Sequence, residues 1–181
     1  MILSEIQKKV DLQIMSYGGY WRPLSMMLRL VEETGELARA INIKHGDKKS
    51  KSISDGREIQ TELVDVFYTS VALSNFYKID LTSTFEEDES IETIQAQMKK
   101  IKNENINYLS VLLKLISKIG KLSEIIDAKN IDSGNKEIID SITGIITTII
   151  EIAIEFEIDL SKEFDIKINA DESKMIKVYN S

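Results

Sequence analysis

The chain repeats a pair of helical patterns in the same order. The segment LRLVEETGELARAI (28–41) matches LKLISKIGKLSEII (113–126) in two leucines at its start, in its glycine and in its final isoleucine. The segment 57–81 matches 136–160, because both open with a basic residue followed by Glu-Ile and both close with Ile-Asp-Leu. A chain with this repeat is expected to form two similar helical hairpins that pack about a pseudo-twofold axis.

Few residues that break helices interrupt these patterns, since the 181 residues include one proline and eight glycines. Apolar residues recur with helical spacing through most of the chain. We expect helices at 3–16, 24–43, 57–77, 90–127 with a break near 103–107, and 136–157. The predicted fold is an all-α tandem-repeat bundle, with one repeat in residues 1–86 and the other in residues 87–181.

Charge and composition argue against several classes of function. The net charge is -7, whereas a general nucleic-acid binder carries a basic face. The absence of cysteine excludes disulfides, zinc–thiolate sites and a cysteine nucleophile. The N-terminal segment is charged from Glu5 onward, and Glu151 and Glu155 interrupt the longest apolar stretch. We therefore expect a cytoplasmic protein with no secretory signal and no membrane span.

Acidic residues distinguish the first repeat from the second. The first repeat carries Glu32, Glu33, Glu36, Glu62 and Asp65. The corresponding positions of the second repeat are Ser117, Lys118, Lys121, Ser141 and Gly144. A packing requirement would act on both halves, so it does not explain five acids that occur in one half only.

Helical spacing places these acids on two faces that we expect to meet. At about 100° per residue, the three glutamates of the first helix form an arc beside an apolar arc. That apolar arc consists of Leu24, Met27, Leu28, Val31, Gly35, Ala38 and Ile41. Glu62 and Asp65 share a face with apolar residues, and buried carboxylates must be paired, protonated or bound to metal. Oxygen ligands suit Mg²⁺ or Mn²⁺; the alternative is a solvated or salt-bridged acidic face.

The motifs EETGE (32–36) and ELVD (62–65) resemble the E-E-x-x-E…E-x-x-D signature of the MazG-type all-α NTP pyrophosphohydrolases, which are related to the dimeric dUTPases. The resemblance implies that Glu33, Glu36, Glu62 and Asp65 bind Mg²⁺, with Mn²⁺ as an alternative. It also implies that Glu32 and Glu33 act in catalysis, Glu32 as a further ligand or by orienting the attacking water. Residues 1–86 would be the catalytic repeat, and residues 87–181 a degenerate repeat that completes an intramolecular pseudo-dimer.

The function that this resemblance implies is hydrolysis of a nucleoside or deoxynucleoside triphosphate to the monophosphate and pyrophosphate, in sanitation of the nucleotide pool. Two alternatives remain open: a dUTPase-like enzyme with a strong base preference, and a non-catalytic helical interaction or regulatory protein on the same scaffold. A homodimer of the whole chain is also left open.

Further residues are candidates for binding the nucleotide. Trp21, with the neighbouring Tyr20, is suited to stacking on a base, and packing at the end of the bundle is the alternative. Arg22 is suited to reaching a phosphate. Lys44 and Lys48 belong to a lysine-rich loop that is shorter in the second repeat, where they would contact phosphates or remain solvated.

Overall fold

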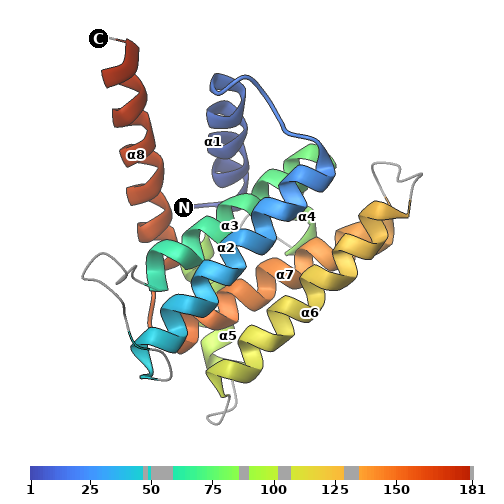
Figure 1. Cartoon of the computed structure of the whole chain (residues 1–181), viewed down its shortest axis with the longest axis vertical. Helices are drawn as coiled ribbons and strands as arrows, with labels where there is room; N and C mark the ends of the chain where they lie inside the picture. Colours follow the sequence, from blue (N-terminus) through green and yellow to red (C-terminus); the bar gives the residue numbers. More distant parts are fainter. Residues whose placement is uncertain (47–48, 50–58, 86–89, 102–106, 129–134, 180–181) are drawn as a thin grey trace.

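The computed structural model describes the chain apart from residues 47–48, 50–58, 86–89, 102–106, 129–134 and 180–181. Its described residues contain helices and no strand (Figure 1), which confirms the predicted all-α class. The helices are α1 (Leu3–Ser16), α2 (Pro23–Lys44), α3 (Ile59–Phe76), α4 (Leu81–Thr84), α5 (Ile91–Ile101), α6 (Tyr108–Asp127), α7 (Lys136–Glu155) and α8 (Leu160–Tyr179). None of them, within the described residues, combines the length and apolar character needed to cross a bilayer.

Each predicted helix begins and ends close to an observed one. The predicted break near 103–107 falls between α5 and α6 and lies mostly outside the described residues. Helices α4 and α8 were not among the predicted helices. Both begin at the leucine of an Ile-Asp-Leu sequence, and the aspartate caps the helix. The carboxylate of Asp80 accepts a hydrogen bond from the backbone N–H of Thr82 at 2.9 Å, and that of Asp159 accepts one from Lys162 at 3.0 Å. The sequence signal for both helices was therefore present.

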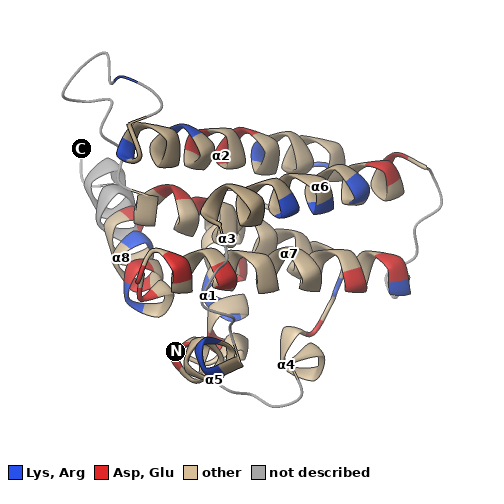
Figure 2. Ribbon diagram, turned by 90° about the horizontal axis from the view of Figure 1, so that it is seen from below, with Lys and Arg blue, Asp and Glu red and all other residues tan. Residues whose placement is uncertain are grey.

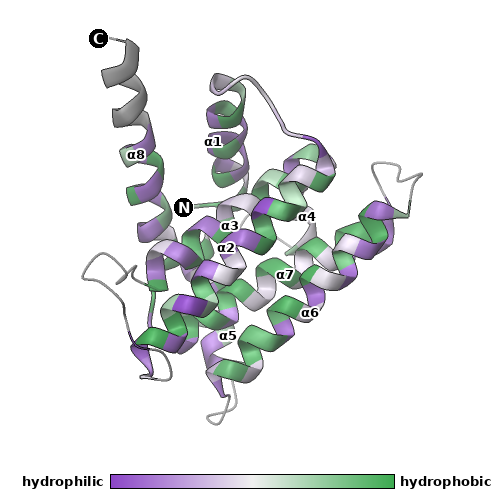
Figure 3. Cartoon of the chain, viewed as in Figure 1, coloured by the Kyte–Doolittle hydropathy of each residue, from purple (hydrophilic) through white to green (hydrophobic). Residues whose placement is uncertain are grey.

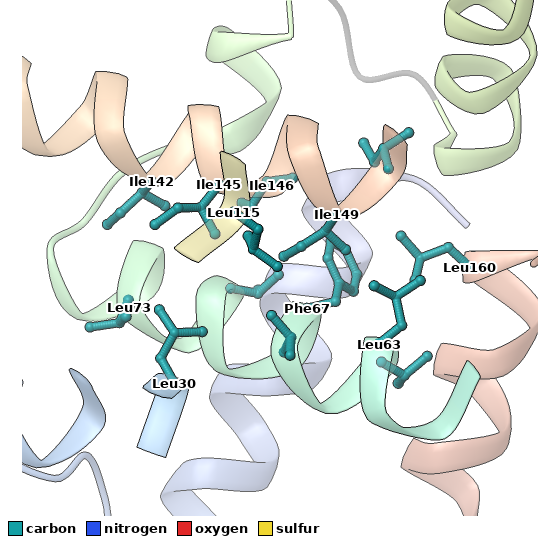
Figure 4. Close-up of a cluster of buried hydrophobic side chains, with 14 of the residues drawn as sticks. Leu30, Leu63, Phe67, Leu73, Leu115, Ile142, Ile145, Ile146, Ile149 and Leu160 are labelled. Atoms are coloured by element: carbon teal, nitrogen blue, oxygen red, sulfur yellow. The ribbon is translucent and has the colours of Figure 1, made fainter. Parts of the chain in front are cut away.

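The central helix of the bundle is α3, which packs against α1, α2, α7 and α8. Most of its side chains are buried. Leu63 and Phe67 of α3 belong to one hydrophobic cluster with Leu115 of α6 and Ile146 and Ile149 of α7 (Figure 4). The two predicted hairpins therefore share a single core.

The packing of the first four helices recurs among the last four. Helix α2 packs against α3, and α6 packs against α7; α1 packs against α3 and α4, and α5 packs against α7 and α8. The amide of Gln7 donates to the carbonyl of Ile79 at 2.8 Å, and the amide of Gln95 donates to the carbonyl of Ile158 at 2.9 Å. This recurrence supports two equivalent halves, although their division at residues 86 and 87 remains a prediction.

The apolar arc predicted on α2 packs against the core only in part, through Met27 and Ile41. Leu24, Leu28 and Val31 of that arc are exposed. The buried face consists of Met26, Met27, Leu30, Glu33, Thr34, Leu37, Ala40 and Ile41. Helix α2 carries two apolar stripes, and only the packing against α3 decides which one is buried. This choice places Glu33 in the interface and leaves Glu32 at the surface.

Exposed apolar residues of α2 and α6 lie on neighbouring helices. The two helices run side by side in opposite directions in front of α3 and α7 (Figure 1), and both carry hydrophobic residues (Figure 3). By the repeat, Leu24, Leu28 and Val31 correspond to Leu109, Leu113 and Ile116, and all six are exposed. We call these six residues the α2/α6 apolar face.

Candidate active site

Three carboxylates converge between α2 and α3. One oxygen from each of Glu33, Glu62 and Asp65 lies within 4.8 Å of the other two. Glu33 and Glu62 are buried and Asp65 is half-buried. Acidic stretches of the two helices lie next to each other in Figure 2. The predicted meeting of the two acidic helix faces therefore occurs in the folded chain.

The positions of these residues follow from local helix geometry. Glu33 lies between Leu30 and Leu37 on the buried face of α2, where helical spacing brings the three residues to one side. Glu62 and Asp65 lie three positions apart in the sequence, so both project from one face of α3. Because α3 is packed on several sides, its carboxylates lie inside the bundle instead of along a solvated stripe.

Burial and crowding change the ionisation of Glu33. Burial, together with the nearby charge of Asp65, raises the pKa of Glu33 to about 7, although Arg29 acts in the opposite direction. The Oε2 atom of Glu33 has no hydrogen-bond partner among the described residues. A buried carboxylate oxygen without a partner is unfavourable, so a cation at this position would stabilise the site.

Two basic side chains neutralise part of this acidic cluster. The guanidinium of Arg29 pairs with Glu33 and, at 2.8 Å, with Glu32. The amine of Lys167, from α8, pairs with Asp65 at 2.5 Å. Although burial opposes its ionisation, the bond to Asp65 raises the pKa of Lys167, so this amine remains charged. The C-terminal half of the chain thus contributes a positively charged side chain to the site.

A pocket of about 410 Å³ adjoins the carboxylates, within the usual size range for small-molecule sites. It lies between α1, the link that follows it, α2, α3 and α8. Charged groups and aromatic rings both line it. The charged residues are Arg29, Glu33, Asp65, Lys167 and Asp171, and the aromatic residues are Tyr17, Tyr20, Trp21 and Tyr68.

The two other predicted acids lie at the edge of this arrangement. Glu32 is exposed and paired with Arg29. Glu36 is half-buried one turn beyond Glu33, and its charge contributes to the raised pKa of Glu33. It lies outside the group of three converging carboxylates. The catalytic role of Glu32 and the metal-binding role of Glu36 remain predictions.

The predicted nucleotide-binding residues have different positions. Trp21 lines the pocket, but it is 62% exposed. Arg22 precedes α2 and is exposed, and it is not among the pocket-lining residues. Lys44 lies at the opposite end of α2 from Trp21, and it does not line the pocket either. Lys48 lies outside the described residues.

Sequence reasoning missed Lys167, because its partner Asp65 is far away in the sequence and the pairing depends on how α8 packs against α3. It also missed Gln13, which is buried and lines the pocket from α1. Gln13 continues the helical spacing of the apolar residues of α1. This spacing was the one sequence pattern that could have indicated its burial.

The three carboxylates suit a divalent cation. They offer only oxygen ligands, which Mg²⁺ and Mn²⁺ prefer. Their oxygens lie close enough to share an ion, and the unpartnered Oε2 of Glu33 is one of the atoms that would benefit. The chemistry of the donor set therefore fits the metal that the acidic motifs predict, while the identity of the ion remains a prediction.

The equivalent place in the second half has different contents. Lys118 corresponds to Glu33, and Gly144 corresponds to Asp65. The Nζ atom of Lys118 lies 2.7 Å from the point that a Cβ of Gly144 would occupy. The amine of Lys118 therefore lies against α7, at the position where the first half has the carboxylates of Glu33 and Asp65. This arrangement cannot bind a cation between the same two positions.

Comparison with known proteins finds a family match for the part of the chain that contains the carboxylates. The model of the MazG nucleotide pyrophosphohydrolase domain matches residues 22–105. The uncharacterized protein YpjD of Bacillus subtilis (strain 168) is 41% identical over 80 residues, which are 44% of this chain and 72% of that protein. The chain belongs to the MazG family. No solved structure matches it.

The MazG match includes both acidic motifs and therefore all three converging carboxylates. It ends before α6, so α7, α8 and Lys167 lie outside it. Helix α1, with Gln13, precedes it. Part of the pocket is thus built by segments that the MazG match does not cover.

Proposed function

We propose that the chain is a Mg²⁺-dependent nucleoside triphosphate pyrophosphohydrolase. The observation that carries this proposal is the convergence of Glu33, Glu62 and Asp65 beside a pocket that also contains two basic side chains. A triphosphate needs positive charge, and this acidic protein supplies it locally through Arg29, Lys167 and a bound cation. The MazG nucleotide pyrophosphohydrolase match supports the same class of reaction.

The proposed reaction breaks the bond between the α-phosphorus and the oxygen that bridges it to the β-phosphorus. A water oxygen forms a new bond to the α-phosphorus, pyrophosphate leaves with the bridging oxygen, and the water protons pass to a base and to the products. Mg²⁺, when bound, supplies electrostatic stabilisation of the phosphate oxygens and lowers the pKa of bound water. Glu33, Glu62 and Asp65 would hold it, with Glu36 as a fourth ligand.

The remaining residues have separate proposed roles. Arg29 and Lys167 would pair with phosphate oxygens once a cation replaces them at the carboxylates. Glu32 would orient the water or contribute a further ligand. Trp21 would stack on the base. The second half would act as the structural partner in an intramolecular pseudo-dimer, so that each chain has one site and works in the cytoplasm on the nucleotide pool.

The test is release of pyrophosphate from a panel of ribo- and deoxynucleoside triphosphates, with Mg²⁺ and with EDTA. Glu62→Gln and Asp65→Asn keep the size of the side chain, remove a charged ligand and are expected to abolish turnover without unfolding the helices. Lys118→Ala is the matched control, because Lys118 corresponds to Glu33 in the second half. It is expected to retain full activity.

Circular dichroism of each variant separates lost chemistry from lost folding. A folded Asp65→Asn variant with full activity would exclude Asp65 as a ligand. No pyrophosphate from any triphosphate in the panel would refute the proposed reaction and favour a binding protein on the same scaffold.

A further inference from the structure

The buried stripe of α1 ends in a polar residue whose side chain has no hydrogen-bond partner among the described residues. Leu3, Ile6, Val10 and Gln13 are the buried residues of this helix. Gln13 is 8% exposed, and neither its side-chain nitrogen nor its side-chain oxygen forms a hydrogen bond within the described part of the chain. Burying an amide without a partner is unfavourable, whereas an apolar residue would continue the stripe at no such cost.

The position equivalent to Gln13 in the second half contains an isoleucine. Gln7 and Gln95 are equivalent, because each binds the main chain of the Ile-Asp-Leu segment in its own half. Counting six residues onward from each leads to Gln13 in α1 and to Ile101 in α5. Ile101 is 82% exposed, so the second half has neither a polar nor a buried side chain at this position. A buried amide at this position therefore occurs only in the half that has the carboxylates.

Gln13 also lies beside the candidate active site. It lines the same pocket as Arg29, Glu33 and Lys167, which form its charged part. Aromatic residues line the pocket as well. Tyr20 is held in place, since its hydroxyl donates to Asp11 at 2.6 Å. A ligand that has an anionic group beside Arg29 and Lys167 and a flat polar group near α1 would contact both the charged and the aromatic part of the pocket.

We propose that Gln13 is the base-recognition residue of this pocket, with its amide hydrogen-bonded to the Watson–Crick edge of the substrate nucleobase. This inference rests on the proposed function, and it adds the orientation of the substrate, with the base against α1 and the triphosphate between α2, α3 and α8. An amide has one acceptor and two donor hydrogens, which match a base edge that presents a donor beside an acceptor. Binding the base gives both buried atoms of Gln13 the partners that they lack.

Two substitutions on one helix provide a test. Gln13→Met keeps the side-chain length and removes the polar atoms, as does the matched control Gln7→Met. Gln7 is fully partnered in the free protein: its amide also donates to Asn75 at 2.8 Å and accepts from the backbone N–H of Leu81 at 3.0 Å. Without ligand, we expect the melting temperature to rise by about 3 °C in Gln13→Met and to fall in Gln7→Met.

Ligand binding is then measured without turnover, using α,β-imido analogues of deoxynucleoside triphosphates that carry each of the four bases or uracil, with Mg²⁺. We expect the wild-type dissociation constants to differ between bases by at least about tenfold. Gln13→Met is expected to reduce that spread to about twofold and to leave binding of inorganic tripolyphosphate unchanged. Gln7→Met is expected to retain the wild-type order of bases.

The outcomes separate this inference from the proposed function. Analogue binding that depends on Gln13, without pyrophosphate release from the natural triphosphates, would refute the reaction and support the base site. Pyrophosphate release with an unchanged base preference in Gln13→Met would support the reaction and overturn the base site. A lower melting temperature for Gln13→Met would make Gln13 a structural residue and also overturn the base site, and a failure of the wild type to bind any analogue would overturn both.

Discussion

Glu33 makes the stability of the metal-free protein depend on pH. Burial, together with Asp65, raises its pKa to about 7, compared with an ordinary value of 4.5. Between these pH values the native state keeps a proton that the unfolded chain has lost. The resulting stabilisation is fully present below pH 4.5 and is lost as the pH rises through 7. The difference in pKa corresponds to about 3 kcal/mol of unfolding free energy.

Thermal unfolding in EDTA measures this effect. For a chain of this length, a loss of about 3 kcal/mol lowers the melting temperature by about 6–12 °C, and we expect that difference between buffer at pH 4.5 and buffer well above pH 7. Glu33→Gln is neutral at every pH, so its melting temperature is expected to change much less. The variant also corrects for every other group of the chain that changes its ionisation over the same range of pH.

Magnesium is expected to reverse the loss at alkaline pH, because it binds the native carboxylates in place of the proton. The stabilisation of the wild type by Mg²⁺ should therefore be larger in alkaline than in acidic buffer. Parallel pH profiles of the wild type and Glu33→Gln in EDTA would refute the reasoning. They would mean that the carboxylate of Glu33 is not held in a crowded, buried site.

Two further predictions concern the charge and the surface of the bundle. Lys167→Met removes the amine that pairs with Asp65, so Mg²⁺ is expected to bind more tightly, by about tenfold or less in titration calorimetry; weaker binding would contradict competition between the amine and the cation. Leu28 and Leu113 are the most exposed residues of the α2/α6 apolar face. If the face joins two copies of the chain, the double substitution to glutamate should convert a dimer to a monomer in analytical ultracentrifugation, and a wild type that is already monomeric would exclude this role.

The sequence was sufficient for the positions of the long helices and for the meeting of Glu33, Glu62 and Asp65. Both follow from short-range spacing, in which helix periodicity and the i, i+3 separation of two acids determine which residues share a face. The sequence was not sufficient to predict which face of α2 is buried. Leu24 and Leu28 fit one apolar stripe as well as Met26 and Leu30 fit the other, and only contact with α3 decides between them.

The contribution of α8 shows a second limit. Lys167 lies in a helix that the sequence analysis did not predict, and its pairing with Asp65 joins the two halves of the chain. No local pattern specifies a contact over that separation. The acids of the first half were recognisable because a second copy of the same pattern lacks them. No such comparison was available for Lys167, because α8 corresponds in the first half to the much shorter α4.

The difference between the halves can itself be tested by restoring the acids. Lys118→Glu, Ser141→Glu and Gly144→Asp together reproduce Glu33, Glu62 and Asp65 at their equivalent positions in α6 and α7. If the two halves are equivalent and Lys118 now occupies the place of a cation, this variant should bind additional Mn²⁺, measured as a higher stoichiometry in calorimetry. Lys118→Ala alone should not, because it removes the amine without supplying ligands. A folded triple variant with unchanged stoichiometry would show that a common packing pattern is not sufficient to place these carboxylates around a metal ion.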